Sequence, residues 1–136
     1  MIVIAAVDDG GGMMFNHRRQ SQDRILREHI LEMSGGRLWM NQYSSGQFSG
    51  AEGLRVDDDF LEKAGDGEFC FVEDRPLSPC ADRIERVILF KWNRNYPGDF
   101  HFDLDVAAPP WKLLEISEFP GFSHEKITKE VYGRDG

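Results

Sequence analysis

The chain has 136 residues, about 40% of them hydrophobic and 12% aromatic, which suits one folded domain spanning 1–136 and excludes a disordered chain. The 24 acidic and 16 basic residues give a net charge of −8. This balance disfavours general binding to nucleic acid, because that requires an excess of positive charge. The acidity is explained by solubility or, alternatively, by docking to a basic protein partner.

No run of about 18 apolar residues occurs, so the sequence predicts no membrane span. The chain opens on the apolar run 2–7 with no basic region before it, which is unlike a secretory signal peptide. The two cysteines have no CxxC spacing and indicate neither a disulfide framework nor a zinc site. We therefore expect a cytoplasmic protein.

The first elements are a buried strand and an amphipathic helix. The apolar run 2–7 is typical of a strand buried on both faces, and an acidic, glycine-rich turn follows it. Apolar residues then recur at helical spacing over 25–33. Ser21 or Asp23 is suited to cap the start of this helix, and Gly35 is suited to end it.

The middle of the chain alternates short strands with one short helix. Residues 37–40 predict a strand, and the polar, Ser- and Gly-rich stretch 41–53 predicts a loop. A short helix is expected over 60–64, capped by one of the three aspartates before it. Residues 69–72 and 86–92 are apolar and predict two further buried strands.

The last part of the chain predicts only strands. Residues 100–103 alternate apolar and polar, and 111–116 can pair with 127–132 as a final hairpin. The complete order predicts an α/β domain with a mainly parallel sheet. That sheet has an antiparallel C-terminal edge and is flanked by two or three helices.

Four segments resemble dihydrofolate reductase. The strand 2–7 is similar to that family's opening strand, and 82–89 is similar to its strand after the cofactor loop. Residues 98–102, Gly-Asp-Phe-His-Phe, resemble its Gly-Asp-Thr-Phe-Phe turn, and 111–113 resemble the start of its last hairpin. The resemblance implies a dihydrofolate reductase-like fold over the whole chain.

The residues with which that family holds NADPH are replaced. The family has a Gly-Gly pair after a buried strand, which lets the backbone approach the pyrophosphate, but Glu73 and Asp74 follow strand 69–72 here. Two carboxylates there repel a phosphate. The family also has a Gly-Arg-(Lys/His)-Thr stretch, whose counterpart here is Asn41, Gln42, Tyr43 and Ser44. We therefore expect no cofactor, and no NADPH in particular.

The acid that the family uses for catalysis is also displaced. Counting along the first helix places Ile25 at the position of the family's carboxylate, with Asp23 two residues away. Phe90 stands where the family has a supporting Thr. A divergent reductase of a pterin-like substrate, with Asp23 as its proton donor, stays open as an alternative.

Residues 11–23 and 123–132 resemble a group of short bacterial proteins that are often labelled ribonuclease Z. True ribonuclease Z has a metallo-β-lactamase fold and an HxHxDH zinc cluster. The four histidines of this chain do not have that spacing: His17, His29, His101 and His124. We therefore interpret the label as incorrect and expect no metal site.

The densest polar stretch, 16–23, is expected to border the cleft at the carboxyl end of the first strand, where ligands bind in such sheets. His17 is a candidate general base there, and Arg18 or Arg19 could clamp a phosphate or carboxylate. The remaining candidate ligand-binding residues are Asn16, Gln20, Asn41, Gln42, Tyr43 and Ser44. The alternative interpretation is a solvated loop with a helix cap.

Three functions follow from these patterns. The favoured one is a non-reducing protein that binds a small molecule or a protein partner on this scaffold. The second is the divergent reductase that uses Asp23. The third is a ribonuclease without a metal, in which His17 and His124 act as an acid/base pair. Separately, Glu73 and Asp74 could join Asp8 and Asp9 in binding a cation, although we favour ordinary solvated carboxylates.

Overall fold

A seven-stranded sheet forms the centre of the molecule in this computed structural model, which describes residues 1–134. Strand β1 (Ile2–Val7) has parallel neighbours on both sides, β6 (Phe69–Phe71) and β7 (Arg86–Lys91). The strand order is β5-β4-β6-β1-β7-β10-β9. Hydrophobic residues run along β1 because both of its flanks and both of its faces are covered.

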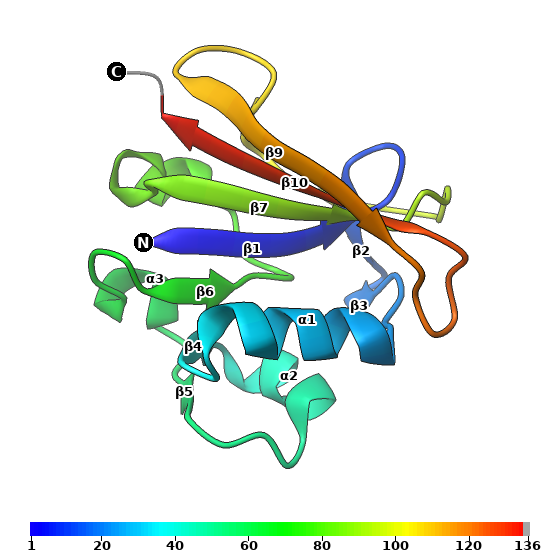
Figure 1. Cartoon of the computed structure of the whole chain (residues 1–136). Coiled ribbons are helices and arrows are strands. Elements are labelled where there is room, and N and C mark those ends of the chain that lie inside the picture. The colour runs from blue at the N-terminus through cyan, green and yellow to red at the C-terminus, as the bar shows by residue number, and fades with distance from the viewer. Residues whose placement is uncertain (135–136) are drawn as a thin grey trace.

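The two edges of the sheet differ in direction (Figure 1). Strands β4 (Leu38–Met40) and β5 (Leu54–Val56) extend the parallel side. Strand β10 (Ile127–Arg134) pairs antiparallel with β7 and with β9 (Trp111–Phe119), which forms the other edge. The predicted mainly parallel sheet with an antiparallel C-terminal edge is therefore confirmed, and the final hairpin is longer than the sequence pattern indicated.

Helix α1 (Arg24–Ser34) covers one face of the sheet (Figure 1). Its Leu26 and Ile30 are buried in one apolar cluster with Ile4 and Phe90 of the central strands. Their spacing of four residues places both side chains on the same side of the helix, as the periodicity predicted. This packing holds the start of α1 beside the carboxyl ends of the strands.

The other face carries only short elements. These are α3 (Phe60–Lys63) and the 3₁₀ helix η2 (Ser78–Arg83). Phe60 of α3 is fully buried, and Leu77 and Ile84 are buried at the two ends of η2. No helix within residues 1–134 is long and apolar enough to cross a bilayer.

Of the two candidate caps of α1, the structure selects Asp23. Its carboxylate accepts hydrogen bonds from the backbone N–H groups of Ile25 and Leu26, at 2.9 and 3.2 Å. Gly35 ends the helix with φ 62°, a left-handed conformation that glycine adopts without steric cost. Both predicted boundaries of this helix are confirmed.

The stretch 41–53 is not the loop that its composition predicted. It forms the short helix α2 (Gln42–Ser45) and the 3₁₀ turn η1 (Gly46–Phe48). The Asn41 side chain caps α2 by accepting from Ser44 N, and buried Phe48 anchors the turn. A polar sequence with one apolar anchor lacks hydrophobic periodicity, so its pattern concealed these helices.

A second, three-stranded sheet was predicted only in part, by the strand pattern at 100–103. It has the order β3-β2-β8 and consists of β2 (Gly12–Phe15), β3 (Arg18–Arg19) and β8 (Phe100–His101). Asn16 and His17 join β2 to β3 with φ angles of 53° and 63°. Two positive φ angles in a two-residue hairpin loop favour Asn-Gly, and His at the second position is unusual. The sequence therefore lacked the usual hairpin signal.

Candidate functional site

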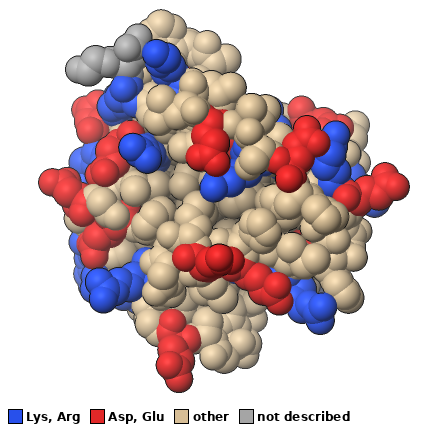
Figure 2. Space-filling model, viewed as in Figure 1, with Lys and Arg blue, Asp and Glu red and all other residues tan. Residues whose placement is uncertain are grey.

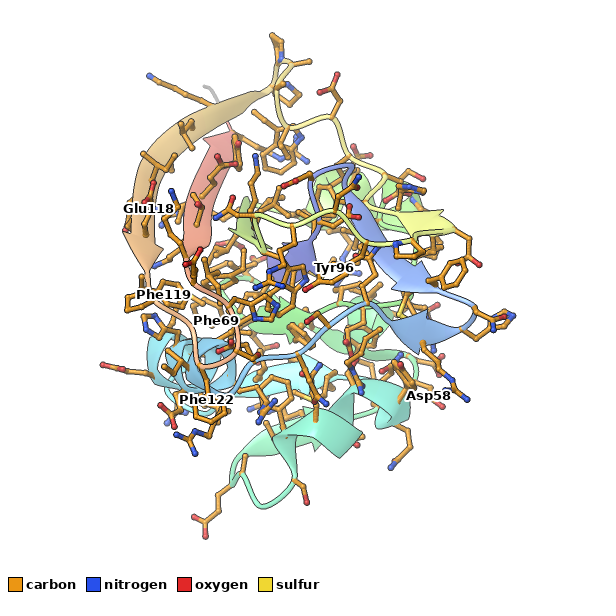
Figure 3. The ribbon with its side chains drawn as sticks, turned by 90° about the vertical axis from the view of Figure 1, so that its right-hand side faces the viewer. Asp58, Phe69, Tyr96, Glu118, Phe119 and Phe122 are labelled. Atoms are coloured by element: carbon orange, nitrogen blue, oxygen red, sulfur yellow. The ribbon has the colours of Figure 1, made fainter. Side chains whose placement is uncertain are left out.

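The most buried polar contact lies between the start of α1 and the loop that joins β9 to β10. Nδ1 of His124 lies 2.9 Å from Oδ2 of Asp23. The two side chains are 3% and 0% exposed. Figure 3 shows the end of this loop beside α1, where Phe119 and Phe122 are labelled. The ring of Phe119 stacks on His29 of α1, which helps to fix the loop.

Asp23 is held as an anion by a shell of donors. Beyond the two N–H groups of α1, it accepts from the backbone N–H of Phe122 at 3.0 Å and of Ser123 at 2.8 Å, and from Ser123 Oγ at 3.2 Å. Burial alone raises the pKa of Asp23, but the hydrogen bonds from Phe122, His124, Ser123 and Leu26 outweigh it. The net effect holds the pKa of this carboxyl well below its usual range. We call Asp23, His124 and the 122–123 backbone the Asp23 clamp.

The far side of the His124 ring meets two hydroxyl groups. Its Nε2 lies 3.0 Å from Oγ of Ser21 and 3.1 Å from the OH of Tyr96. The ring also stacks on Trp92, with 4.4 Å between ring centroids. Tyr96 reaches the site from the loop that follows β7, and Figure 3 shows it near the centre of the molecule. Residues of two separate segments, 21–23 and 92–96, therefore converge on one imidazole of the β9–β10 loop.

Ser21 also lines a narrow cleft beside the start of α1. Ala6 of β1, Leu26 of α1, Trp92 and Glu73 line it as well. The cavity has a volume of about 20 Å³. A space of that size holds about one water molecule, so the cleft is too small for a pterin or a nicotinamide ring in this conformation.

An ion pair borders this cleft. Arg19 donates to Glu73 through Nε at 2.8 Å and through Nη2 at 3.2 Å. The guanidinium also lies over the ring of Tyr43, 4.6 Å from its centroid, and Arg19 N donates to Tyr43 OH at 2.8 Å. The neighbouring Asp74 accepts from Asn41 Nδ2 at 2.7 Å. Glu73 and Asp74 are therefore both engaged with residues of the same chain.

A wider hollow lies on the outer side of the β2–β3 hairpin. Four of the predicted ligand-binding residues line it: Asn16, Arg18, Arg19 and Gln20. Its other walls are Phe15, Tyr96 and Pro97, and its volume is about 430 Å³. Gln20 Nε2 donates to the carbonyl of Pro97 at 3.1 Å, while its Oε1 is buried without a hydrogen-bond partner among the described residues. We call this space the hairpin hollow.

Other predicted site residues lie elsewhere. His17 is exposed in the β2–β3 turn and lines a different pocket, with Asp74 and Asp99 among its walls. His124 is buried, and its ring nitrogens are engaged by Asp23, Ser21 and Tyr96, so the structure shows no contact between the two histidines. Gln42 is exposed, and its backbone N–H donates to Asp58. Ser44 lies in α2 and is buried, so its side chain does not face a surface where a ligand could bind.

The acids at the strand ends do not gather into a cation site. Asp8 is buried and accepts from the backbone N–H groups of Gly10, Gly12 and Tyr96, at 3.0, 2.7 and 3.0 Å. Glu73 forms an ion pair with the Arg19 guanidinium. No metal-binding group of His, Cys, Asp or Glu side chains occurs in the part of the chain that the structure describes.

Sequence reasoning singled out Asp23 and His124 but did not pair them. It placed His124 with His17, because both are histidines near polar stretches, and it considered Ser21 only as a helix cap. Ser21 and Asp23 are two residues apart, but His124 is 101 residues from Asp23. No local signal links the loop to the helix start. Trp92 and Tyr96 carry no chemical signature of their own.

Comparisons with known proteins identify the fold alone. No protein-family model matches this sequence, and no curated protein does. Among solved structures, the chain is similar to a dihydrofolate reductase from Enterococcus faecalis complexed with NADP(H) and RAB-propyl. The TM-score is 0.69 at 11% identity, covering 99% of this chain and 96% of that one. The chain therefore has a dihydrofolate reductase-like fold with very little sequence identity to that enzyme.

Proposed function

We propose that this protein is a non-reducing binding protein that takes a small anionic molecule in the hairpin hollow and does not use NADPH. The observation that carries the proposal is the contact between Arg19 and Glu73. By the sequence resemblance, Glu73 of this two-point ion pair stands where the family's backbone approaches the cofactor pyrophosphate.

The ion pair argues against a dinucleotide on both steric and electrostatic grounds. Glu73 is 7% exposed, so a phosphate placed beside it meets a poorly solvated negative charge. Arg19 already satisfies that charge, and moving Arg19 to a phosphate leaves Glu73 without a partner. The energy gained from a phosphate contact is then offset by the loss of the contact with Glu73, which stays behind as a poorly solvated charge.

The hairpin hollow has the features of an anion site. Arg18 is exposed at its rim and forms no ion pair within residues 1–134. Phe15, 48% exposed, and Tyr96 add aromatic surface beside that charge. The volume of about 430 Å³ lies within the range of small-molecule sites. An aromatic carboxylate or phosphate matches both the charge and the rings.

Isothermal titration with NADPH, benzoate and phenyl phosphate tests the proposal. We expect no NADPH binding, measurable binding of phenyl phosphate, and weaker binding of benzoate because it carries less charge. Arg18→Gln is expected to abolish phenyl phosphate binding. The matched control, Arg37→Gln, removes an exposed arginine that lines a different pocket and leaves binding unchanged. Micromolar NADPH binding, or phenyl phosphate binding that ignores Arg18→Gln, contradicts the proposal.

The two alternative functions lack a supporting contact. A reductase that uses Asp23 as proton donor needs a protonated carboxyl, but the donor shell of Asp23 favours the anion. If this alternative holds, NADPH oxidation on a pterin panel collapses in Asp23→Asn. A ribonuclease that uses His17 and His124 needs two facing imidazoles, and His124 is engaged elsewhere. In that case RNA cleavage is lost in His17→Ala.

The acidic surface gives only limited support to a basic protein partner. On the face that Figure 2 shows, acidic side chains (red) are interspersed with basic ones (blue). Several oppositely charged side chains of the protein are paired, as Arg24 with Glu28 and Arg55 with Glu68. Interspersed opposite charges cancel beyond about a Debye length, roughly 10 Å, so they do not steer a basic protein from a distance. A small anion at the hairpin hollow is the better-supported ligand.

A further inference from the structure

We propose that Ser21, His124 and Asp23 form a hydrogen-bonded relay that makes Ser21 a nucleophile toward small activated acyl groups, such as the acetyl group of an ester. This activity goes beyond the binding function proposed above and is centred on the cleft beside the start of α1, next to the hairpin hollow. It rests on two short contacts to one imidazole and on the cleft into which Ser21 faces.

The first step of the argument is the tautomer of His124. Asp23 is anionic, so it accepts at every contact, and Nδ1 of His124 at 2.9 Å must donate to it. In the neutral ring the lone pair then belongs to Nε2. An anion with four backbone N–H donors cannot easily rotate away, so the tautomer is held by the fold. This is the role that a buried carboxylate has in a nucleophilic triad.

The second step is the position of Ser21. Its Oγ lies 3.0 Å from Nε2, within reach for the hydroxyl to donate to the ring. Ser21 is half-buried and lines the cleft, so its Oγ is not sealed in the core. Trp92 stacks on the ring and restrains its rotation. The nucleophile, the base and the orienting carboxylate thus form a continuous chain of hydrogen bonds. Its donor–acceptor distances are 3.0 Å from Ser21 to His124 and 2.9 Å from His124 to Asp23.

The third step concerns Tyr96, whose OH lies 3.1 Å from the same Nε2. A neutral imidazole nitrogen has one lone pair, so the two hydroxyls compete for it. When Tyr96 donates, Ser21 is not activated. The tyrosine therefore limits the fraction of molecules in which Ser21 is ready to react, and its removal should raise reactivity.

The chemical step balances without a cofactor. Ser21 Oγ attacks the carbonyl carbon of an ester while its proton passes to Nε2 of His124. The bond from that carbon to the alcohol oxygen breaks, and the alcohol leaves with the proton from Nε2. An acyl-serine remains, and a water molecule attacks it in the same way, which releases the carboxylic acid and restores Ser21.

The size of the cleft sets the substrate class. A volume of about 20 Å³ admits little more than a water molecule, so only the smallest acyl groups can reach Ser21. Leu26 and Trp92 line the space and offer apolar surface to a methyl group. The methyl of an acetyl group is close to a water molecule in size and can enter, while the ester carbonyl and its alcohol stay at the mouth of the cleft; a long acyl chain does not fit.

The experiment uses the full chain and 4-nitrophenyl acetate as the probe. Intact-mass spectrometry after acid quenching, followed by peptide mapping, measures acetylation at Ser21. We expect one acetyl group on Ser21, no such group in Ser21→Ala, and a rate lower by roughly 100-fold in His124→Gln. The matched control is Ser117→Ala, which removes an exposed serine on β9 and leaves the rate unchanged.

Tyr96→Phe keeps the experiment decisive if His124→Gln fails to fold. Within residues 1–134, the hydroxyl that this change removes bonds only to Nε2 of His124, so we expect the fold to be retained. We expect the acetylation rate of Ser21 to rise severalfold. If Ser21 stays unmodified in both the wild type and Tyr96→Phe, or if modification falls on lysines alone, Ser21 is only a structural partner of His124 and the proposal is overturned.

Discussion

Two charged contacts near the same cleft are built in opposite ways. The Asp23 clamp is supported largely by the backbone, through four N–H groups, and its side chains are almost fully buried. The pair of Arg19 and Glu73 is made only of side chains, and Arg19 is 21% exposed. The comparison teaches that one contact is part of the fold itself, whereas the other can break and re-form without unfolding the chain.

The difference has a physical cause. Backbone donors need no side-chain rotamer to be ordered, so the clamp loses little side-chain conformational entropy when it forms. A long arginine side chain must be ordered to form its ion pair, and water competes for both charges. We therefore expect the clamp to govern stability and the ion pair to govern access to the cleft.

The largest effect is expected from Asp23→Ala. The change leaves buried His124 and the N–H groups of Phe122 and Ser123 without their acceptor, and it also removes the cap of α1. We expect a loss of about 3–5 kcal/mol in the free energy of unfolding, measured by urea denaturation. Asp23→Asn, which keeps one acceptor oxygen, should lose less. If Asp23→Ala lowers the free energy of unfolding by less than about 1 kcal/mol, the Asp23 clamp is no more important for stability than the pair of Arg19 and Glu73.

The pH dependence sharpens the same comparison. The pKa of Asp23 is lowered in the folded state, so the folded protein binds fewer protons here than the unfolded one. The stabilisation is complete above the unfolded pKa, about 3.9, and is lost as the pH falls below it. The advantage of the wild type over Asp23→Asn in urea unfolding should therefore be constant from pH 7 to 5 and shrink toward pH 3. A difference that does not change with pH contradicts the assignment.

A smaller, salt-dependent effect is expected at Arg19 and Glu73. A double-mutant cycle with Arg19→Ala and Glu73→Ala should give a coupling of about 1 kcal/mol, because the pair is two-point but partly exposed. The coupling should fall when the urea titrations are repeated at 1 M salt, where screening is strong. A coupling as large as the loss in Asp23→Ala indicates that both contacts belong to the fixed part of the fold.

The smallest effect is expected in the turn of the hairpin that carries Arg19. His17 has φ 63°, a left-handed conformation that is costly for a residue with a Cβ atom. His17→Gly should therefore stabilise the protein by about 1 kcal/mol, measured by urea unfolding. The control is His101→Gly on β8, which should not stabilise, because glycine weakens a strand. Destabilisation by His17→Gly shows instead that the histidine ring holds the turn.

The sequence predicted the large elements better than the small ones. Strand β1 and helix α1 were predicted within two residues of their observed bounds, because a long apolar run and a 3.6-residue periodicity are local signals. Helix α2 escaped because it is short and polar, and the β2–β3 hairpin escaped because its strands are only four and two residues long. Both are stabilised by contacts with residues that are distant in the chain. Examples are Tyr43 OH with Arg19 N and Asp99 with Asn16 N. Four of the predicted ligand-binding residues share one hollow, since 16–20 is a continuous stretch.

By itself, the sequence determined the α/β order of elements, a cap of α1 at Ser21 or Asp23, and a pair of carboxylates directly after the predicted strand 69–72, all of which depend on neighbouring residues. Only the tertiary structure decided which side chains satisfy those carboxylates. Glu73 meets Arg19 across 54 residues, and Asp23 meets His124 across 101. Such contacts depend on how strands align and how loops fold back, and every buried charge must find a partner within the space that packing leaves.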